Sequence, residues 1–102
     1  MPATCTVLYR RSAELDIDHY VNTHMTMASK FFSPSILLSW EVFALPEDSP
    51  FSVQTDITWA SLEACQDALA SEHGKALSED IKLCSKEKPI VFFRESIKRS
   101  EE

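Results

Sequence analysis

The sequence predicts an α+β fold whose elements follow the order β-α-β-β-α-β. Four segments are rich in the β-branched and aromatic residues that are typical of strands. Two segments with apolar residues at helical spacing separate the first strand from the second and the third from the fourth. A five-residue turn (PEDSP) joins the middle two strands, so they are expected to be antiparallel neighbours. This order is the ferredoxin-like arrangement, an antiparallel sheet with both helices on one face, and the short turn disfavours a parallel α/β sheet.

The expected strands have definite boundaries in the sequence. They are Thr4–Arg10, Ile36–Leu45, Phe51–Trp59 and Ile90–Arg94. Residues 1–96 form one expected domain, and 97–102 form a charged C-terminal tail.

The first helix is expected to begin after Asp16, which has the position of an N-cap. Leu15 and Tyr20 are spaced as a hydrophobic staple, and the helix must end before Pro34. Its apolar stripe consists of Ile17, Tyr20, Val21, His24, Ala28, Phe31 and Phe32.

Ser61 is expected to cap the second helix, which continues to about Ser71. His73 and Gly74 are predicted to break it, and a shorter helical piece is expected over 76–83.

Composition excludes several classes of function. The 102 residues carry 10 Lys plus Arg against 16 Asp plus Glu, a formal charge of −6, which argues against nucleic-acid binding. Gly74 is the single glycine, so the chain has no glycine-rich phosphate loop or dinucleotide fingerprint. No segment approaches the roughly 20 apolar residues that span a bilayer, so no membrane interaction is expected.

The cysteines Cys5, Cys65 and Cys84 are odd in number and lack a CxxC or Cys/His spacing. Neither a disulfide framework nor a structural zinc site is therefore expected. The N-terminal segment lacks the pattern of a signal peptide. A cytoplasmic protein with reduced thiols is the simplest interpretation.

Both faces of two predicted strands are apolar. Strict alternation places Ile36, Leu38, Trp40, Val42 and Ala44 on one side and Leu37, Phe43 and Leu45 on the other, while Ile90 and Phe92 oppose Val91 and Phe93. Two helices cover only one face of a sheet, so a second copy of the chain is expected against the other face, which predicts a homodimer.

Two histidines are candidate catalytic residues. His24 interrupts an apolar helical stripe, so it is either a core histidine with a hydrogen-bond partner or a proton acceptor beside a cavity. His73 lies at the predicted helix break, where the alternatives are a second catalytic group and an exposed loop histidine.

Five aromatic side chains are candidate substrate-binding residues, namely Tyr9, Tyr20, Phe31, Trp40 and Trp59. Packing in the core is the alternative for Tyr20 and both tryptophans. Gln54 and Asp56 share a strand face and are expected at solvent or at the dimer interface, with a smaller chance of orienting a histidine.

No metal site is predicted. Asp16, Asp18 and His19 lie close together, but the helix dipole accounts for carboxylates at a helix start. His24 as an axial haem ligand is a minor alternative.

The segment from Asp18 to Met25 (DHYVNTHM) follows a strand that ends in Arg10 and Arg11, and it resembles the helix signature of EthD-domain proteins. Residues 61–71 are similar to the second helix of that family, and the element order matches over nearly the whole chain. One departure is Thr26, where the family commonly has proline. The resemblance implies a dimeric α+β barrel, a homodimer, and a functional role for His24. His73 lies near a histidine position of similar polyketide cyclases.

The resemblance implies a small-molecule enzyme without a cofactor. We expect a lyase or cyclase for aromatic polyketide-like substrates, in which His24 moves a proton and His73 or a tyrosine stabilises the developing oxyanion. The alternatives are a quinone-forming monooxygenase for an anthrone-type phenol and a non-catalytic dimeric accessory protein that binds small molecules.

Overall fold

The computed structural model describes residues 1–94 and 97–100. This part contains a four-stranded sheet in the order β2-β3-β1-β4, in which every neighbouring pair is antiparallel. The strands are β1 (Ala3–Arg10), β2 (Leu37–Ala44), β3 (Phe51–Trp59) and β4 (Ile90–Arg94). The predicted α+β, ferredoxin-like fold is confirmed, and the strand boundaries agree to within one residue.

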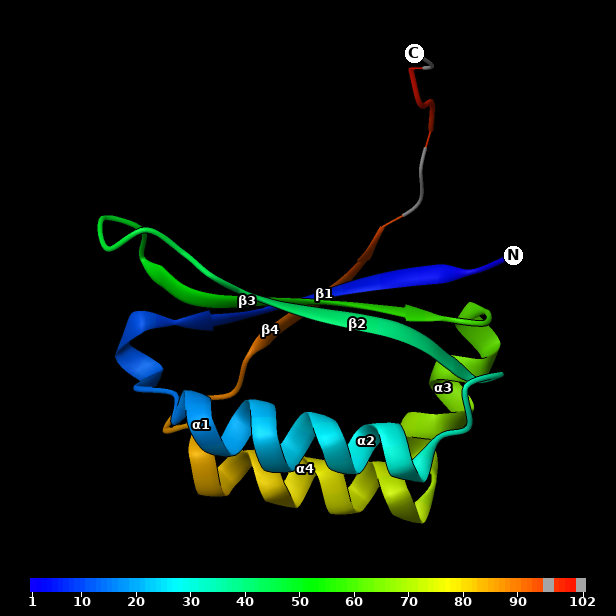
Figure 1. The fold of residues 1–102 in the computed structure, drawn as a ribbon, viewed down its shortest axis with the longest axis horizontal. Coiled ribbons are helices and arrows are strands. Elements are labelled where there is room, and N and C mark those ends of the chain that lie inside the picture. Colours follow the sequence, from blue (N-terminus) through cyan, green and yellow to red (C-terminus); the bar gives the residue numbers. More distant parts are fainter. Residues whose placement is uncertain (95–96, 101–102) are drawn as a thin grey trace.

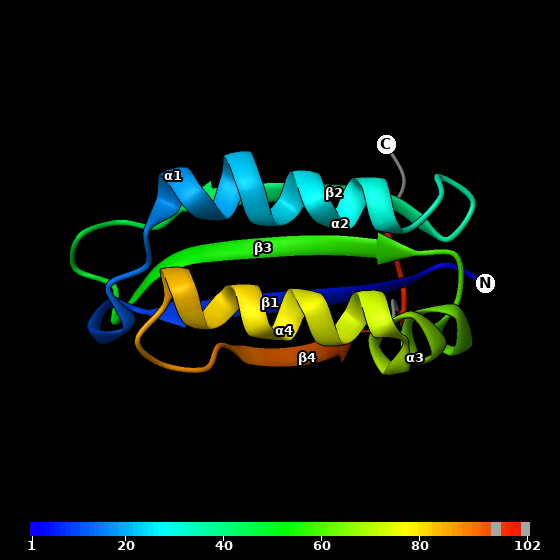
Figure 2. The same ribbon diagram turned by 90° about the horizontal axis from the view of Figure 1, so that it is seen from below.

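The long helical segments lie on one face of the sheet (Figure 1). The first consists of α1 (Ile17–His19), η2 (Tyr20–Met25) and α2 (Thr26–Phe31), and the second is α4 (Glu72–Cys84). Figure 2 shows the first segment beside β2 and α4 beside β1 and β4, with β3 between them. A short helix, η1 (Arg11–Ala13), connects β1 to the first segment, and α3 (Leu62–Ala70) lies at one end of α4.

The first helical segment contains a turn of π-helix, η2, which the sequence did not predict. Asp16 caps the segment as expected, since its side chain accepts a hydrogen bond from the backbone N–H of His19 at 3.1 Å. The helix continues through Thr26, whose hydroxyl donates to the carbonyl of Val21 at 3.4 Å. Turns of π-helix are rare in proteins, and those that occur are often found at functional sites.

The predicted break at His73 and Gly74 is wrong. The chain breaks at Ser71, which ends α3 and caps α4 by accepting a hydrogen bond from the Gly74 backbone N–H at 3.2 Å. His73 and Gly74 therefore lie in the first turn of α4. A Cβ at Gly74 would overlap the backbone oxygen of Leu69, so the glycine permits the close approach of α3.

The predicted faces of β2 are partly wrong. Leu37 pairs with Trp59 but Ser39 pairs with Thr58, so β2 has one more residue than β3 at this point. Because the extra residue reverses the alternation, Leu37 lies on the helix-facing side together with Trp40 and Val42. Simple alternation had placed Leu37 opposite those two residues.

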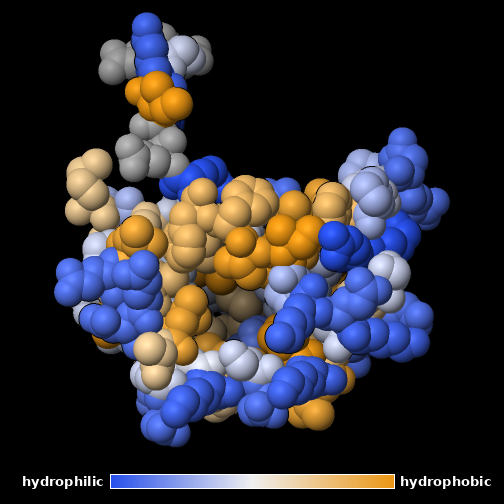
Figure 3. Space-filling model, turned by 180° about the vertical axis from the view of Figure 1, so that it is seen from behind, coloured by the Kyte–Doolittle hydropathy of each residue, from blue (hydrophilic) through white to orange (hydrophobic). Residues whose placement is uncertain are grey.

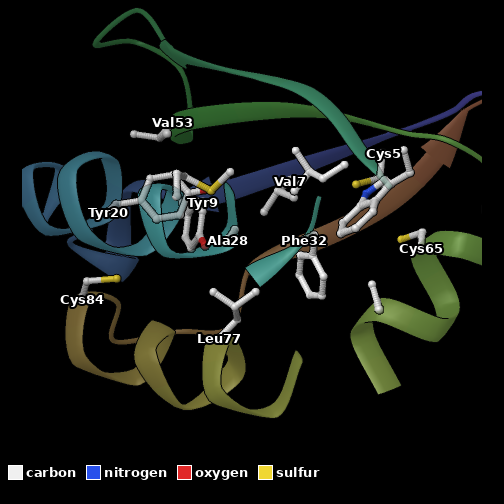
Figure 4. Packing of buried hydrophobic residues seen from close by; sticks show 14 residues of the cluster. Cys5, Val7, Tyr9, Tyr20, Ala28, Phe32, Val53, Cys65, Leu77 and Cys84 are labelled. Atoms are coloured by element: carbon white, nitrogen blue, oxygen red, sulfur yellow. The ribbon is translucent and has the colours of Figure 1, made fainter. Parts of the chain in front are cut away.

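The core lies between the helices and the sheet. Figure 4 shows Tyr9 and Tyr20 beside each other, with Leu77 and Cys84 of α4 close to them. Tyr9, Tyr20 and Val53 are each 1% exposed, so the aromatic pair is the centre of the packing. The three cysteines are buried free thiols.

The opposite face of the sheet is mixed in polarity. The Thr6 hydroxyl donates to Asp56 at 3.1 Å, and Arg94 forms an ion pair with Asp56 at 3.4 Å. Phe92 pairs with Thr6 in the register and is 43% exposed on the same face. Asp56 therefore bonds to Thr6 and Arg94 on this face and does not orient a histidine.

Residues 95–96 at the end of the predicted domain and 101–102 of the predicted C-terminal tail lie outside the described residues. Residues 97–100 form no helix or strand. None of the helices in the described ranges is long and apolar enough to cross a membrane.

Gly74→Ala should lower the free energy of unfolding by about 1–3 kcal/mol, because the new methyl group meets the Leu69 carbonyl. The usual effect of this change inside a helix is a gain of about 1 kcal/mol, so the expected sign is reversed. Urea unfolding followed by circular dichroism measures the difference. Lys75→Ala, at the adjacent exposed position, is the control and should stay within about 0.5 kcal/mol. A stabilised Gly74→Ala would contradict the close packing of α3 on α4.

Candidate functional site

A cavity of about 280 Å³ lies between the helices and the sheet. Its walls are mostly apolar and come from all four strands and from η2, α2, α3 and α4. Pro89, Val91 and Phe93 form one side, with Leu77 and the rest of α4 opposite. Figure 3 shows a hollow in an apolar part of the surface. Concave apolar sites with a few polar groups are typical of small-molecule binding.

His24 lies on η2 and lines this cavity. Its Nδ1 is 2.9 Å from Oδ2 of Asp80 on α4. The two side chains are 9% and 11% exposed, so the contact is shielded from solvent. The other ring nitrogen, Nε2, makes no hydrogen bond to any residue that the structure describes. One nitrogen is therefore held by a carboxylate while the other is free to face a ligand.

Burial and charge act in opposite directions on this pair. Burial lowers the pKa of His24, and this outweighs the hydrogen bond and charge of Asp80, which raise it. Burial would raise the pKa of Asp80, but its hydrogen bonds with His24 and His19 hold that pKa below the ordinary value. At neutral pH the pair is therefore a neutral imidazole and a carboxylate. Nδ1–H donates to Asp80, which leaves the lone pair on Nε2.

His19 contacts the same carboxylate from the preceding turn. Its Nε2 is 3.1 Å from Oδ1 and 3.2 Å from Oδ2 of Asp80. The His19 side chain is 28% exposed, so it forms the solvent side of the cluster. Asp80 thus joins α4 to two successive turns of the first helical segment.

Two tyrosines extend the polar part of the wall. The Tyr20 ring stacks on His24, with centroids 5.4 Å apart and planes inclined by 13°. Its hydroxyl lies 2.7 Å from the Thr55 hydroxyl on β3, and Tyr9 meets the Tyr20 ring edge-on at 5.1 Å. Burial raises the pKa of both phenols, so they remain protonated and able to donate.

Trp59, at the end of β3, also lines the cavity and is 3% exposed. The structure thus brings His24, Tyr9, Tyr20 and Trp59 around one space. It does not bring the other three predicted site residues to this lining.

The three predicted site residues outside the cavity lining are His73, Phe31 and Trp40. His73 and Phe31 contact each other, and Trp40 contacts α2. His73 is exposed, and its ring stacks on Phe31 with centroids 4.1 Å apart. The Trp40 indole N–H donates to the Ser29 hydroxyl at 2.8 Å. Their predicted roles stay predictions.

Sequence reasoning missed Asp80 and Thr55. Asp80 is three residues after Leu77 and four before Cys84, so it lies on the buried side of α4. Thr55 alternates with Val53 and Ile57 on the helix-facing side of β3. In both cases the available signal was a polar residue at a position where the spacing of its neighbours predicts an apolar one. The same signal indicated His24.

Among the residues that the structure describes, no group of three or more His, Cys, Asp or Glu side chains could hold a metal ion. An imidazole oriented by a carboxylate, with phenol donors beside it in an apolar cavity, can accept a proton from a bound molecule and return it.

The comparison with solved structures identifies the fold. An ethyl tert-butyl ether D (EthD) family protein from Bacillus halodurans is 20% identical, with a TM-score of 0.73 over 95% of this chain and 100% of that chain. An EthD-like protein from Ralstonia eutropha is 19% identical, with a TM-score of 0.79 over 97% and 95%. The chain has the EthD fold. The predicted resemblance is confirmed at this level.

The EthD fold extends to a further neighbour. A variant of SnoaB, a cofactor-independent oxygenase from Streptomyces nogalater, is 12% identical, with a TM-score of 0.74 over 99% of this chain and 98% of that chain. No family model matches the sequence, and no curated protein matches it. The likeness is thus one of structure, and it covers nearly the whole chain.

Asp80→Asn should lower the pKa of His24 further, because it removes the negative charge that raises this pKa. The free energy of unfolding at pH 7 should fall by about 1–3 kcal/mol, since a charged hydrogen-bond acceptor is lost. NMR titration of the His24 ring protons and urea unfolding measure the two effects. Asp67→Asn, an exposed change on α3, is the control. An unchanged His24 pKa would show that Asp80 does not act on the ring.

The wild-type protein should lose stability as the pH falls below 6.5. The pKa of His24 is lower in the folded chain than its ordinary value of 6.5, so the unfolded chain binds this proton first. The contribution of Asp80 is lost later, as the pH falls through its lowered pKa, below 3.8. Unfolding free energies between pH 7 and pH 5, compared with those of His24→Gln, check the first step. Equal pH dependence in the two proteins would contradict it.

Proposed function

We propose that this protein is an enzyme that acts on a small aromatic polyketide-like molecule by proton transfer, as a cofactor-independent lyase or cyclase. The observation that carries the proposal is the free Nε2 of His24 on an apolar cavity, with Nδ1 held by Asp80. Burial keeps the imidazole neutral at physiological pH, which is the form that accepts a proton. The fold shared with SnoaB, a cofactor-independent oxygenase, also supports small-molecule chemistry without a cofactor.

Decarboxylation of an aromatic β-keto acid illustrates the proposed step. The carboxyl group is already ionised at neutral pH, so the carbon–carbon bond to the carboxylate breaks directly. CO₂ leaves, and the electron pair remains on the substrate as an enolate, which the tyrosine hydroxyls stabilise as donors. Nε2 of His24 takes a proton from water and delivers it to the enolate carbon, and the hydroxide that remains combines with CO₂ to give bicarbonate. Atoms and electrons balance, so the reaction consumes no oxidant or reductant.

The size of the cavity favours a small aromatic body. An apolar cavity of roughly 150 Å³ holds one benzene ring, and this cavity has about 280 Å³. A molecule with one or two rings therefore fits inside. The cavity is open to the surface, so part of a larger molecule can extend out of it.

A quinone-forming oxygenase is the second candidate, and the structural likeness to SnoaB favours it. In that reaction His24 would deprotonate a phenol, and the electron-rich phenolate would react with O₂. An oxygen electrode with a dihydroxynaphthalene as substrate separates the candidates, because only the oxygenase consumes O₂. A non-catalytic carrier would bind such molecules without changing their rate of reaction.

His24→Gln should reduce the enzyme-catalysed decarboxylation of hydroxybenzoylacetic acid by about 10²- to 10⁴-fold, the usual contribution of a group that transfers a proton in the transition state. Substrate binding should change little, since glutamine keeps a polar group at the cavity. CO₂ release and calorimetric titration with the product ketone measure the two effects. Full turnover in a folded His24→Gln protein would remove His24 from the mechanism.

His73→Gln tests the second predicted catalytic residue in the same assay. Its ring stacks on Phe31 and lies outside the cavity lining, so we expect a smaller effect than that of His24→Gln. A loss as large as that of His24→Gln would return His73 to a catalytic role.

We propose in addition that the chain forms a homodimer through the helix-free face of the sheet. Phe92 is 43% exposed on this face, and Leu8, Phe43 and Ile90 lie on the same side. The Thr6, Asp56 and Arg94 cluster at its centre has internal partners for its charges, so it can be covered at less cost than unpaired groups. A second sheet packed face to face would cover the apolar side chains.

Phe92→Glu should convert the dimer to a monomer, because it places a charge within the proposed interface. Light scattering coupled to size-exclusion chromatography at micromolar concentration measures the mass. Leu83→Glu, at a position that is 75% exposed on α4, is the control and should remain dimeric. A monomeric wild-type protein would contradict the proposal.

A further inference from the structure

His19 and His24 share one carboxylate, and both rings contact the same oxygen of it. Nε2 of His19 lies 3.1 Å from Oδ1 and 3.2 Å from Oδ2 of Asp80. Nδ1 of His24 lies 2.9 Å from Oδ2. The pKa of Asp80 is held below its ordinary value, so the group is a carboxylate and both ring nitrogens donate an N–H to it.

The two rings differ in their access to solvent. The side chain of His19 is 28% exposed, while those of His24 and Asp80 are 9% and 11% exposed. Histidine is the side chain whose charge changes between roughly pH 5 and 8. A proton from solvent can therefore place a charge on the outer ring, directly against the carboxylate that holds the inner one.

A charge on His19 would weaken the support that Asp80 gives to His24. The contact of His19 with both oxygens would become a charge-assisted bond, which is roughly twice as strong as a neutral one. The charge of Asp80 raises the pKa of His24, and a positive charge on His19 lowers it. Geometry and charge thus act in the same direction, against the protonation of His24.

The other titratable groups packed around this cluster are neutral. Tyr20 stacks on His24 from the same helical segment, Tyr9 lies on β1, and Cys84 follows Asp80 by one turn of α4. Burial raises the pKa of all three groups. The two phenols and the thiol therefore add no charge beside Asp80 at neutral or acidic pH.

The charged groups nearby have other contacts. Asp16 accepts a hydrogen bond from the backbone N–H of His19 at 3.1 Å, and Asp18 is exposed. Glu79 and Lys82 form an ion pair at 3.1 Å on the exposed side of α4. Within the described ranges, the basic side chains that contact Asp80 are thus the two histidines.

We infer that His19 is a positioning residue that acts on His24 through Asp80. A neutral His19 leaves the carboxylate to support a proton on His24, and a protonated His19 draws the carboxylate to itself and makes His24 a weaker base. The inference rests on the proposed function in one respect, namely that His24 is the group that transfers a proton. It assigns the outer histidine a role beyond joining two helices.

Titration of the unmodified protein is the first test. NMR follows the ring protons of His19 and His24 separately between about pH 5 and 8. The His24 resonances should respond in two steps, one of which coincides with the protonation of His19, because coupled groups do not titrate independently. A His24 curve with one step and no response to His19 would overturn the inference, whether or not any variant folds.

His19→Gln is the second test. Glutamine keeps an N–H donor for Asp80 but takes up no proton, so the helix contact remains while the titrating charge is removed. The titration midpoint of His24 should rise, and its curve should become a single step. His19→Leu removes the donor as well and should show the same rise with a lower free energy of unfolding. Lys30→Gln, which removes an exposed cation on α2, is the control and should leave the His24 curve unchanged.

The outcomes separate this inference from the proposed function. A His24 midpoint in His19→Gln equal to that of the wild type would show that His19 only joins the helices, and would overturn the inference. These titrations use the free protein, so they do not depend on turnover. If hydroxybenzoylacetic acid is turned over, the pH at which the rate changes should shift with the His24 midpoint. A shifted midpoint in a protein without turnover would support the inference while contradicting the proposed reaction.

Discussion

One carboxylate joins the two long helical segments that lie on the same face of the sheet. Asp80 accepts hydrogen bonds from His24 at 2.9 Å and from His19 at 3.1 Å, so α4 is joined to two successive turns of the opposite segment. Without this contact, a buried imidazole and a buried carboxylate would both lack partners, which is a costly state in a poorly solvated interior. The same bond fixes which nitrogen of His24 carries the hydrogen. The position of the helices and the chemistry of the cavity therefore depend on one interaction.

The wide turn of η2 provides the geometry for that interaction. Tyr20 and His24 are four residues apart, and in this turn their rings lie nearly parallel at 5.4 Å. Tyr20 is hydrogen-bonded to Thr55 in the sheet. The imidazole that stacks on Tyr20 is therefore positioned relative to β3. The ring of His24 is thus held from three directions, by the sheet, by α4 and by its own helix. A proton acceptor positioned in this way loses little freedom when a ligand binds.

Sequence reasoning succeeded where the spacing of residues within one segment decides the structure. It failed where a contact between two elements decides it. The strands were predictable because β-branched runs and the turn at 46–50 are local signals. The end of α3 near Ser71 was predictable, but the start of α4 at Glu72 was not, since Gly74 is needed for contact with α3 and was taken for a helix break. The face of Leu37 was missed because an extra residue in β2 is invisible to strict alternation. His24 was identifiable from its apolar stripe, but its partner lies on another helix, and one sequence does not specify which helices face each other.

Two features of the site act in opposite directions on the pKa of His24. Their balance explains why an apolar cavity can contain a base. Burial alone lowers the pKa of the imidazole and weakens it as a proton acceptor, while the charge of Asp80 restores part of its basicity. A carboxylate directly within the cavity would repel an anionic ligand or enolate, but Asp80 contacts the ring from the far side and leaves the space itself uncharged. In the proposed reaction, the negative charge would therefore support the imidazolium without opposing the substrate. In the proposed site, a neutral imidazole in a mostly apolar wall is then the polar group that would orient a small aromatic molecule.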